Sequence, residues 1–224
     1  MPIAVGIAGS ISACGIGHAS PAAQPDKGEV VARDSVRGYA VPIYEIGEIE
    51  ADNTPQGMDG FAIRVAYVLH AWTREHGVEA IGNLCHTRDG QHWGTLLLTI
   101  YAHTASPRTD ACPTGMQSSG VDIHSHPQRW RYPVNAVDRL FLHDGLLDAG
   151  HVSTQPDVYS PDDLQAPGYL AGQMKLHFQD GRGHQRIVWN MATPEPVVAK
   201  IGARARSPSR SPSHPIIQRF SGRS

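Results

Sequence analysis

The pattern of apolar and polar positions predicts one long helix near the middle of the chain. From Met58 to His76, apolar residues recur every three or four positions, which places them on one face of a helix. Asp59 is a suitable N-cap, and Gly77 is expected to end the helix in a left-handed conformation.

Short apolar runs between turn residues predict a set of strands around this helix. The expected strands are Tyr39–Ile46, Val78–His86, Trp93–Tyr101 and Ser119–His126, followed by a hairpin of Lys175–Phe178 and Arg186–Trp189. Weaker helical signals begin at Ala136 and at Ser160, where Pro161 suits the first helical position. The order of elements predicts an α+β fold, specifically an α/β/α sandwich in which helices flank a mixed sheet.

This pattern is confined to about residues 30–195, which are expected to form a single domain. Residues 196–224 are rich in Ser, Pro and Arg and lack periodicity, so we expect them to be disordered. Residues 128–159 are interpreted as an insertion within the domain. Its Trp130 and Tyr132 could face a substrate or pack on the surface.

Residues 1–29 resemble an export segment followed by a linker. No charged residue precedes Asp26, and residues 11–14 (ISAC) are similar to a bacterial lipobox, although the basic start of a signal peptide is missing. We therefore expect an exported protein, either periplasmic or anchored in the envelope by a lipid on Cys14. Cys85 and Cys112 would then be free to form a disulfide; otherwise Cys85 is a small buried apolar residue.

Charge is distributed unevenly along the chain. The formal net charge is −2, but the last 25 residues hold six basic and no acidic side chains. The part before Lys200 therefore carries 13 basic and 21 acidic residues, a net charge of −8. A body of this sign disfavours nucleic acid as a partner.

Two histidines at the end of a predicted strand are the clearest sign of chemistry. His124 and His126 are two positions apart, so their side chains point to the same face of an extended strand. Pro127 is expected to end the strand directly after them. Because neutral imidazole is a common zinc ligand, the pair predicts two ligands of an open zinc site.

A catalytic zinc site also needs a third ligand and a base. Glu79 begins an otherwise apolar strand, where a carboxylate is costly unless it reaches solvent, a partner or a metal-bound water. It is therefore the candidate base. Two aspartates are candidates for the third ligand: Asp138, which follows Asn135 by three positions, and Asp163, which follows Ser160 by three positions.

Together these residues resemble the signature of the JAMM (MPN-plus) metalloproteases. That signature is a glutamate on an early strand, an HxHP and a downstream Ser-x-x-Asp, here Glu79, His124-Ser125-His126-Pro127 and Ser160-x-x-Asp163. The text from Tyr159 to Asp163, followed by Gly168-Tyr169-Leu170, is most similar to a bacterial JAMM-like domain of uncharacterised function. The resemblance covers about residues 58–190.

The resemblance implies a JAMM/cytidine-deaminase-like fold and a zinc-dependent amide or isopeptide hydrolase. His124, His126 and Asp163 would hold Zn²⁺. Glu79 would move the proton from water to the leaving amine, and the Ser160 hydroxyl would donate to the oxyanion. For an exported enzyme, the expected substrate is a peptide or isopeptide bond in peptidoglycan or in a secreted partner. The alternative function is an inactive binding or accessory lipoprotein.

One spacing departs from the family pattern. The Ser-x-x-Asp usually follows the HxHP by about eight residues, where this chain has Asn135-Ala-Val-Asp138. We favour Asp163 as the ligand, with residues 128–159 inserted before it, and Asp138 is the alternative. A second zinc template, that of D-Ala-D-Ala-type peptidases, would use His103 and Asp110, but Asp110 lies too close to His124 in sequence for that fold. His103, together with His86 and His92, is therefore expected to be exposed.

Overall fold

In the computed structural model, the described residues are 27–52, 54, 56–107, 109–141 and 150–193. The expected lipid-bearing Cys14, the expected tail at 196–224 and the second half of the helix expected over 136–147 lie outside the described residues. No helix within the described ranges is long and apolar enough to cross a membrane.

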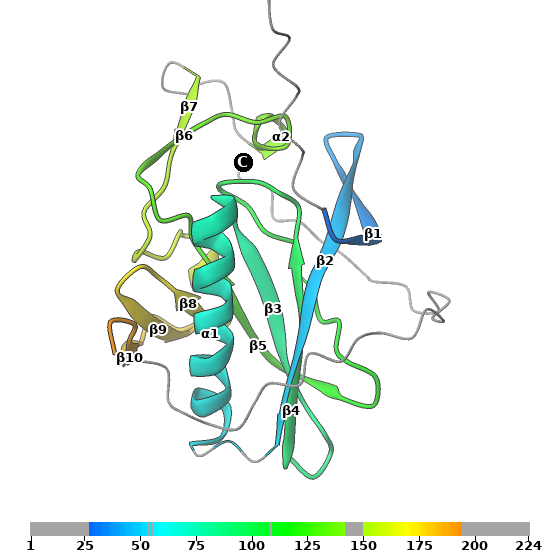
Figure 1. Cartoon of the computed structure of the whole chain (residues 1–224), viewed down its shortest axis with the longest axis vertical. Coiled ribbons are helices and arrows are strands. Elements are labelled where there is room, and N and C mark those ends of the chain that lie inside the picture. The colour runs from blue at the N-terminus through cyan, green and yellow to red at the C-terminus, as the bar shows by residue number, and fades with distance from the viewer. Residues whose placement is uncertain (1–26, 53, 55, 108, 142–149, 194–224) are drawn as a thin grey trace, which may run out of the picture.

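The described residues form a mixed α/β structure dominated by one large mixed sheet (Figure 1). The sheet has the strand order β1-β2-β4-β3-β5-β8-β9-β10. Its strands are β1 (Glu29–Val36), β2 (Tyr39–Asp52), β3 (Ala80–His86), β4 (His92–Thr99), β5 (Gln117–Ser125), β8 (Pro167–Ala171), β9 (Lys175–Asp180) and β10 (Gln185–Asn190). The other elements are helix α1 (Gly57–His76), the short helix α2 (Asp138–Phe141), the 3₁₀ turn η2 (Asp163–Gln165) and the small strand pair β6 (Arg131–Pro133) and β7 (His151–Ser153). The mixed sheet expected from the sequence is confirmed.

One strand that the sequence did not predict is important for the site. β8 pairs with β5 in parallel, from Asp122 opposite Gly168 to Ser125 opposite Ala171. The remaining neighbours in the large sheet are antiparallel. β8 has the short sequence PGYLA, in which Pro and Gly hide the strand signal. Because η2 directly precedes β8, the pairing of β8 with β5 places η2 close to the histidines.

The two faces of the sheet are covered differently. Helix α1 buries Phe61 and Leu69 against one face, in a core that also includes Ile123 of β5. Ile81 and Leu98 belong to a second core on the opposite face, where α2 packs. Since side chains alternate along a strand, the neighbours of Ile123 in β5 point away from α1. The predicted zinc ligands therefore lie on the face opposite the long helix.

The ends of α1 agree only partly with the sequence-based expectation. Gly77 ends the helix as predicted, with a φ of 73° and its N–H donating to the Thr73 carbonyl at 2.7 Å. The prediction that Asp59 caps the N-terminus was wrong, because Gln56 occupies that position. Asp59 instead accepts hydrogen bonds from the Tyr169 hydroxyl at 2.5 Å and from Arg186 at 2.8 Å. It thereby ties the first turn of α1 to β8 and β10.

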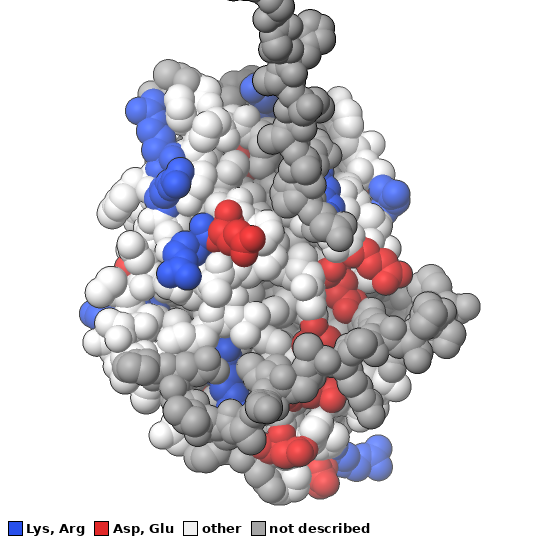
Figure 2. Space-filling model, in the orientation of Figure 1, with Lys and Arg blue, Asp and Glu red and all other residues white. Residues whose placement is uncertain are grey.

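Acidic side chains gather on one side of the molecule. β2 carries four of them, Glu45, Glu48, Glu50 and Asp52, and Figure 2 shows acidic groups along the side on which Figure 1 places β2. The basic side chains in this view lie in small separate groups. Part of the negative charge inferred for the body of the chain therefore lies along β2.

A disulfide joins β3 to the long loop before β5. Cys85 and Cys112 are bonded, with their Cα atoms 5.8 Å apart and 27 positions apart in sequence. Cys85 is fully buried, so the bond is anchored in the core. The even cysteine pair left by the lipobox interpretation thus forms the disulfide that the sequence allowed.

Breaking this disulfide should destabilise the protein considerably. Closing a loop of this length lowers the entropy of the unfolded chain by the equivalent of about 3.5 kcal/mol. We expect treatment with a phosphine reductant to lower the free energy of unfolding in urea by roughly that amount. The control is Cys112→Ala, which should already have the lower stability and should not respond to the reductant. Equal stability of the oxidised and reduced wild type would contradict this assignment.

Candidate metal centre

The register between β3 and β5 places Glu79 next to the histidine pair. Ile81 is opposite His124 and Ala80 is opposite Ser125, so the next residue outward on the β3 side, Glu79, lies across from His126. Because side chains alternate, Ile81, Glu79 and the two histidines share one face. Sheet geometry alone therefore explains why the predicted base and two predicted ligands converge.

The backbone of Glu79 is held on both sides. Its N–H donates to the Ala102 carbonyl at 2.8 Å, and its own carbonyl accepts from the Thr99 hydroxyl at 2.6 Å. Its carboxylate lies 3.9 Å from Nε2 of His126 and is 7% exposed. Burial raises the pKa of Glu79 to about 7, although the nearby imidazoles of His126 and His124 oppose the increase. This carboxyl group is thus suited to exchange a proton near neutral pH.

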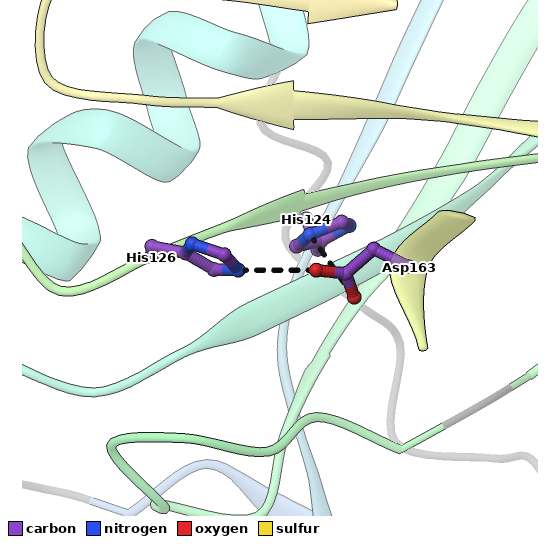
Figure 3. Close-up of side chains that lie close together, drawn as sticks. All are labelled: His124, His126 and Asp163. Atoms are coloured by element: carbon purple, nitrogen blue, oxygen red, sulfur yellow. Dashed lines mark ion pairs between the residues drawn. The ribbon is translucent and has the colours of Figure 1, made fainter. Parts of the chain in front are cut away.

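Asp163 completes a compact group with the two histidines (Figure 3). One carboxylate oxygen lies 3.6 Å from Nε2 of His124, and the other lies 3.6 Å from Nε2 of His126. The ligand atoms of the three residues all lie within 4.8 Å of one another. Of the two aspartates that the sequence offered, the structure brings Asp163 to the histidines.

The spacing and donor types of this triad are compatible with a metal ion such as zinc. Two ligands bound tetrahedrally at about 2.0–2.1 Å from zinc are themselves about 3.4 Å apart, close to the observed spacing between Asp163 and each ring. Nε2 of His124 is buried and has no hydrogen-bond partner among the described residues, which is costly for a polar atom unless something else binds it. Two imidazole nitrogens and one carboxylate also match the three protein ligands of many catalytic zinc sites.

The charges of the triad are strongly coupled. Burial alone would raise the pKa of Asp163, but the imidazoles of His124 and His126 hold it far below its usual range. Burial likewise disfavours the charged form of His124, yet the carboxylates of Asp163 and Asp122 hold its pKa well above the usual value. Asp163 is therefore the anionic member of the group.

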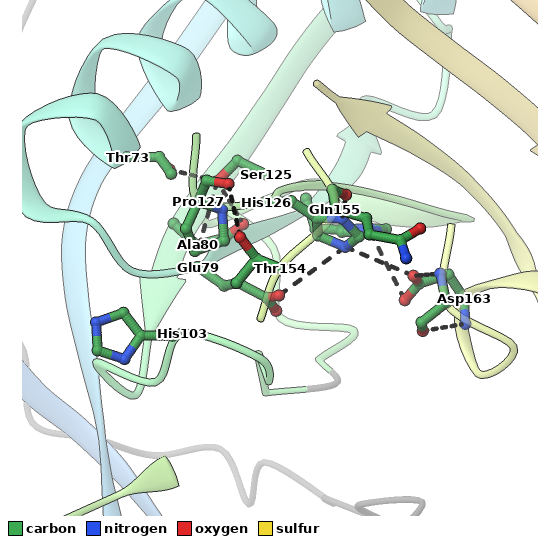
Figure 4. A network of polar contacts seen from close by, with 12 residues as sticks. Thr73, Glu79, Ala80, His103, Ser125, His126, Pro127, Thr154, Gln155 and Asp163 are labelled. Atoms are coloured by element: carbon green, nitrogen blue, oxygen red, sulfur yellow. Dashed lines mark hydrogen bonds and ion pairs between the residues drawn. The ribbon is translucent and has the colours of Figure 1, made fainter. Parts of the chain in front are cut away.

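Asp163 is linked to His126 in a network of polar contacts (Figure 4). It owes its position to a local turn with Ser160. The Ser160 N–H donates to the Asp163 carboxylate at 2.6 Å, and the Asp163 N–H donates to the Ser160 hydroxyl at 3.3 Å. This is the reciprocal arrangement of a capping box. The expected helix stops after the single turn η2, because Pro167 follows at the start of β8. Ser160 is therefore adjacent to the triad, and its hydroxyl and N–H both help to orient Asp163.

Asp138 has a different partner. It is fully buried and accepts hydrogen bonds from the backbone N–H of His103 at 2.7 Å, from Nδ1 of His103 at 2.6 Å and from the N–H of Asn135 at 2.9 Å. The Asn135 side chain in turn accepts from the Asp138 N–H at 2.9 Å. The alternative ligand thus fixes α2 to the loop that follows β4.

His103 corrects one expectation from the sequence. It was expected to be exposed, but it is 8% exposed and stacks on Tyr132, with ring centroids 4.7 Å apart. The template that paired His103 with Asp110 is not seen, since Asp138 holds the imidazole and Asp110 is exposed. His86 and His92 are partly buried at strand ends.

Sequence reasoning missed two groups that face the outer ring nitrogens of the histidine pair. The Gln155 carbonyl lies 3.0 Å from Nδ1 of His126, and a carboxylate oxygen of Asp122 lies 3.5 Å from Nδ1 of His124. Asp122 was detectable, because it lies two positions before His124 on the same strand face. Gln155 was not, because it contributes only a backbone carbonyl from a distant segment.

The end of the insertion borders the centre. Tyr132 is buried against His103, whereas Trp130 is 69% exposed. A cavity of about 80 Å³ lies beside Gln155 and is lined by Trp130, Gln155, Pro156, Asp157, Val158 and Gln173. The insertion therefore has a packed part at Tyr132 and an exposed part at Trp130, and its Gln155 contacts the centre.

Comparison of the chain with models of protein families, with curated proteins and with solved structures found no match.

Proposed function

We propose that this protein is a zinc-dependent amide or isopeptide hydrolase of the JAMM type, built as an α/β/α sandwich. The proposal is carried by one observation: two histidines, an aspartate and a buried glutamate from three separate segments converge on one face of the sheet. The resemblance of Glu79, the HxHP and the Ser160-x-x-Asp163 motif to the JAMM signature supports it from the sequence.

In this proposal, the site residues have two kinds of role: some would bind the zinc ion, and others would act on the substrate or transfer a proton. His124, His126 and Asp163 would hold the zinc ion. Bound zinc supplies Lewis-acid polarisation of the scissile carbonyl and lowers the pKa of a coordinated water toward about 7. Glu79 would accept a proton at its carboxylate and return it to the leaving amine, a task that suits a pKa of about 7. Ser160, which adjoins Asp163, would donate a hydrogen bond to the oxyanion.

The proposed compartment and substrate rest on the N-terminal residues 11–14 and on the disulfide. The lipobox-like residues 11–14 suggest export, and a disulfide is typical of oxidising compartments outside the cytosol. We therefore propose an envelope or secreted enzyme that acts on peptide or isopeptide bonds, with peptidoglycan peptides as the first candidates. Attachment to the membrane would occur through a lipid on Cys14.

The first test is metal content together with bond cleavage. Purified protein should contain about one zinc per chain by mass spectrometry, and His126→Ala should lose it. The zinc-loaded protein, incubated in ¹⁸O-water with peptidoglycan digests and with a mixed peptide library, should leave one ¹⁸O atom in each new carboxylate. His184→Ala is the matched control, because this histidine is 84% exposed and far along the chain in the β9–β10 turn.

Two results would contradict the proposed function. One is a wild-type protein without zinc, or with zinc that survives His126→Ala. The other is zinc-loaded protein that incorporates no ¹⁸O into either substrate mixture.

A further inference from the structure

His124 is held between two carboxylates that approach different ring nitrogens. Its Nε2 lies 3.6 Å from Asp163, and its Nδ1 lies 3.5 Å from Asp122. The second distance is that of an ion pair, longer than a typical hydrogen bond. The two distances nevertheless define the orientation of the ring, with Nδ1 toward Asp122 and Nε2 toward Asp163. Asp122 therefore lies behind His124 as seen from Asp163, which does not suit a fourth ligand.

A glycine on the neighbouring strand makes room for Asp122. Gly168 of β8 is paired with Asp122, and a Cβ atom built on Gly168 would lie only 2.6 Å from the Asp122 carboxylate. The backbone of Gly168 is not in the left-handed region that often requires glycine. The lack of a side chain at this buried position is therefore explained by the carboxylate beside it.

The other side of His124 is also closed. The Tyr159 ring meets the imidazole edge-on, with centroids 6.3 Å apart, and its hydroxyl donates to the Gly168 carbonyl at 3.1 Å. The same glycine thus leaves space for Asp122 and anchors the tyrosine that limits movement of the ring. His124 is 4% exposed as a result.

We propose that Asp122 is a positioning residue for the zinc site, and that Gly168 is the residue that permits it. Asp122 accepts the Nδ1 proton of His124, which leaves the Nε2 lone pair to the metal and makes it more basic. Carboxylates in this outer position orient zinc-bound histidines in many metal sites. The Asp122 side chain is 34% exposed, so solvent reaches it as well as the imidazole. This inference rests on the zinc site of the proposed function. It adds a residue, Asp122, that orients the His124 ring.

The test measures zinc affinity by competition with a chromophoric chelator at neutral pH. Asp122→Asn should weaken zinc binding by about 10–100-fold, the usual effect of removing such a partner. Gly168→Ala should weaken it similarly although Asp122 is still present, because the new methyl group displaces the carboxylate. The matched controls are Asp180→Asn, a strand carboxylate with 32% side-chain exposure, and Gly47→Ala, a strand glycine with open space at its Cβ. Both controls should bind zinc as the wild type does.

A second measurement separates positioning from general damage. In proton NMR spectra of the zinc-loaded protein, the Nδ1–H signals of both histidines should be protected from exchange with water. Asp122→Asn should expose the His124 signal to exchange and leave that of His126, which the Gln155 carbonyl protects, unchanged. Wild-type zinc affinity in both Asp122→Asn and Gly168→Ala would overturn the positioning role while leaving the zinc site intact. Absence of zinc from the wild type would instead overturn the site itself.

Discussion

Asp163→Ala is expected to abolish tight zinc binding, whereas Asp138→Ala should retain it and lose stability instead. Asp163 offers one oxygen to each histidine at 3.6 Å, so its removal takes away the only carboxylate of the triad. The loss of affinity should exceed the roughly 10–100-fold effect of removing an outer partner. Because Asp163 is partly exposed in a surface turn, its removal should leave the fold intact.

Asp138 should behave in the opposite way. Its carboxylate is fully buried and accepts three hydrogen bonds from His103 and Asn135. Removing one member of such a buried pair leaves its partners unsatisfied and typically costs about 3–5 kcal/mol. We expect Asp138→Ala to lower the free energy of unfolding by this amount, and Asp138→Asn, which keeps one acceptor oxygen, to lower it less.

Both variants can be compared by urea unfolding and by zinc titration of the folded protein. If Asp138→Ala lost zinc while still folded, and Asp163→Ala kept it, the assignment of the third ligand would be reversed. The milder Asp138→Asn keeps the comparison informative if Asp138→Ala does not fold.

Glu79→Gln is expected to keep zinc and to lose most of the hydrolytic activity. The amide has nearly the same shape and can keep contact with His126, but it cannot accept and return a proton. General acid–base groups usually contribute about 10²–10⁴-fold to the rate, so kcat should fall by that factor. The zinc content and the unfolding curve should stay close to those of the wild type, since the glutamate is not one of the triad ligands.

The measurement is the rate of ¹⁸O incorporation into peptide substrate by zinc-loaded Glu79→Gln. Glu75→Gln, a change on the solvent-exposed side of α1, is a matched control that should leave the rate unchanged. Undiminished turnover in Glu79→Gln would exclude this residue as the base and would require another proton acceptor at the centre.

Several elements were predictable because their signals are local. The helical spacing before Gly77 predicted α1, and the apolar runs Val78–His86 and Trp93–Tyr101 predicted β3 and β4, each to within about two residues. The strand that carries the histidine pair and the final hairpin were also predicted. Four strands were not predicted. Of these, β6 and β7 have only three residues each, and β1 and β8 lack clear alternation of apolar and polar residues.

The sequence by itself determined that His124 and His126 share one strand face, because side chains alternate along any strand. Local geometry did not separate the two aspartates, because Asn135-x-x-Asp138 and Ser160-x-x-Asp163 form the same reciprocal local turn; only the family resemblance favoured Asp163. Each motif orients an aspartate carboxylate, but the local sequence does not specify which histidine that carboxylate contacts. Only the tertiary structure decided this, by placing β8 parallel to β5 so that η2 reaches the histidine pair, and by burying Asp138 against His103.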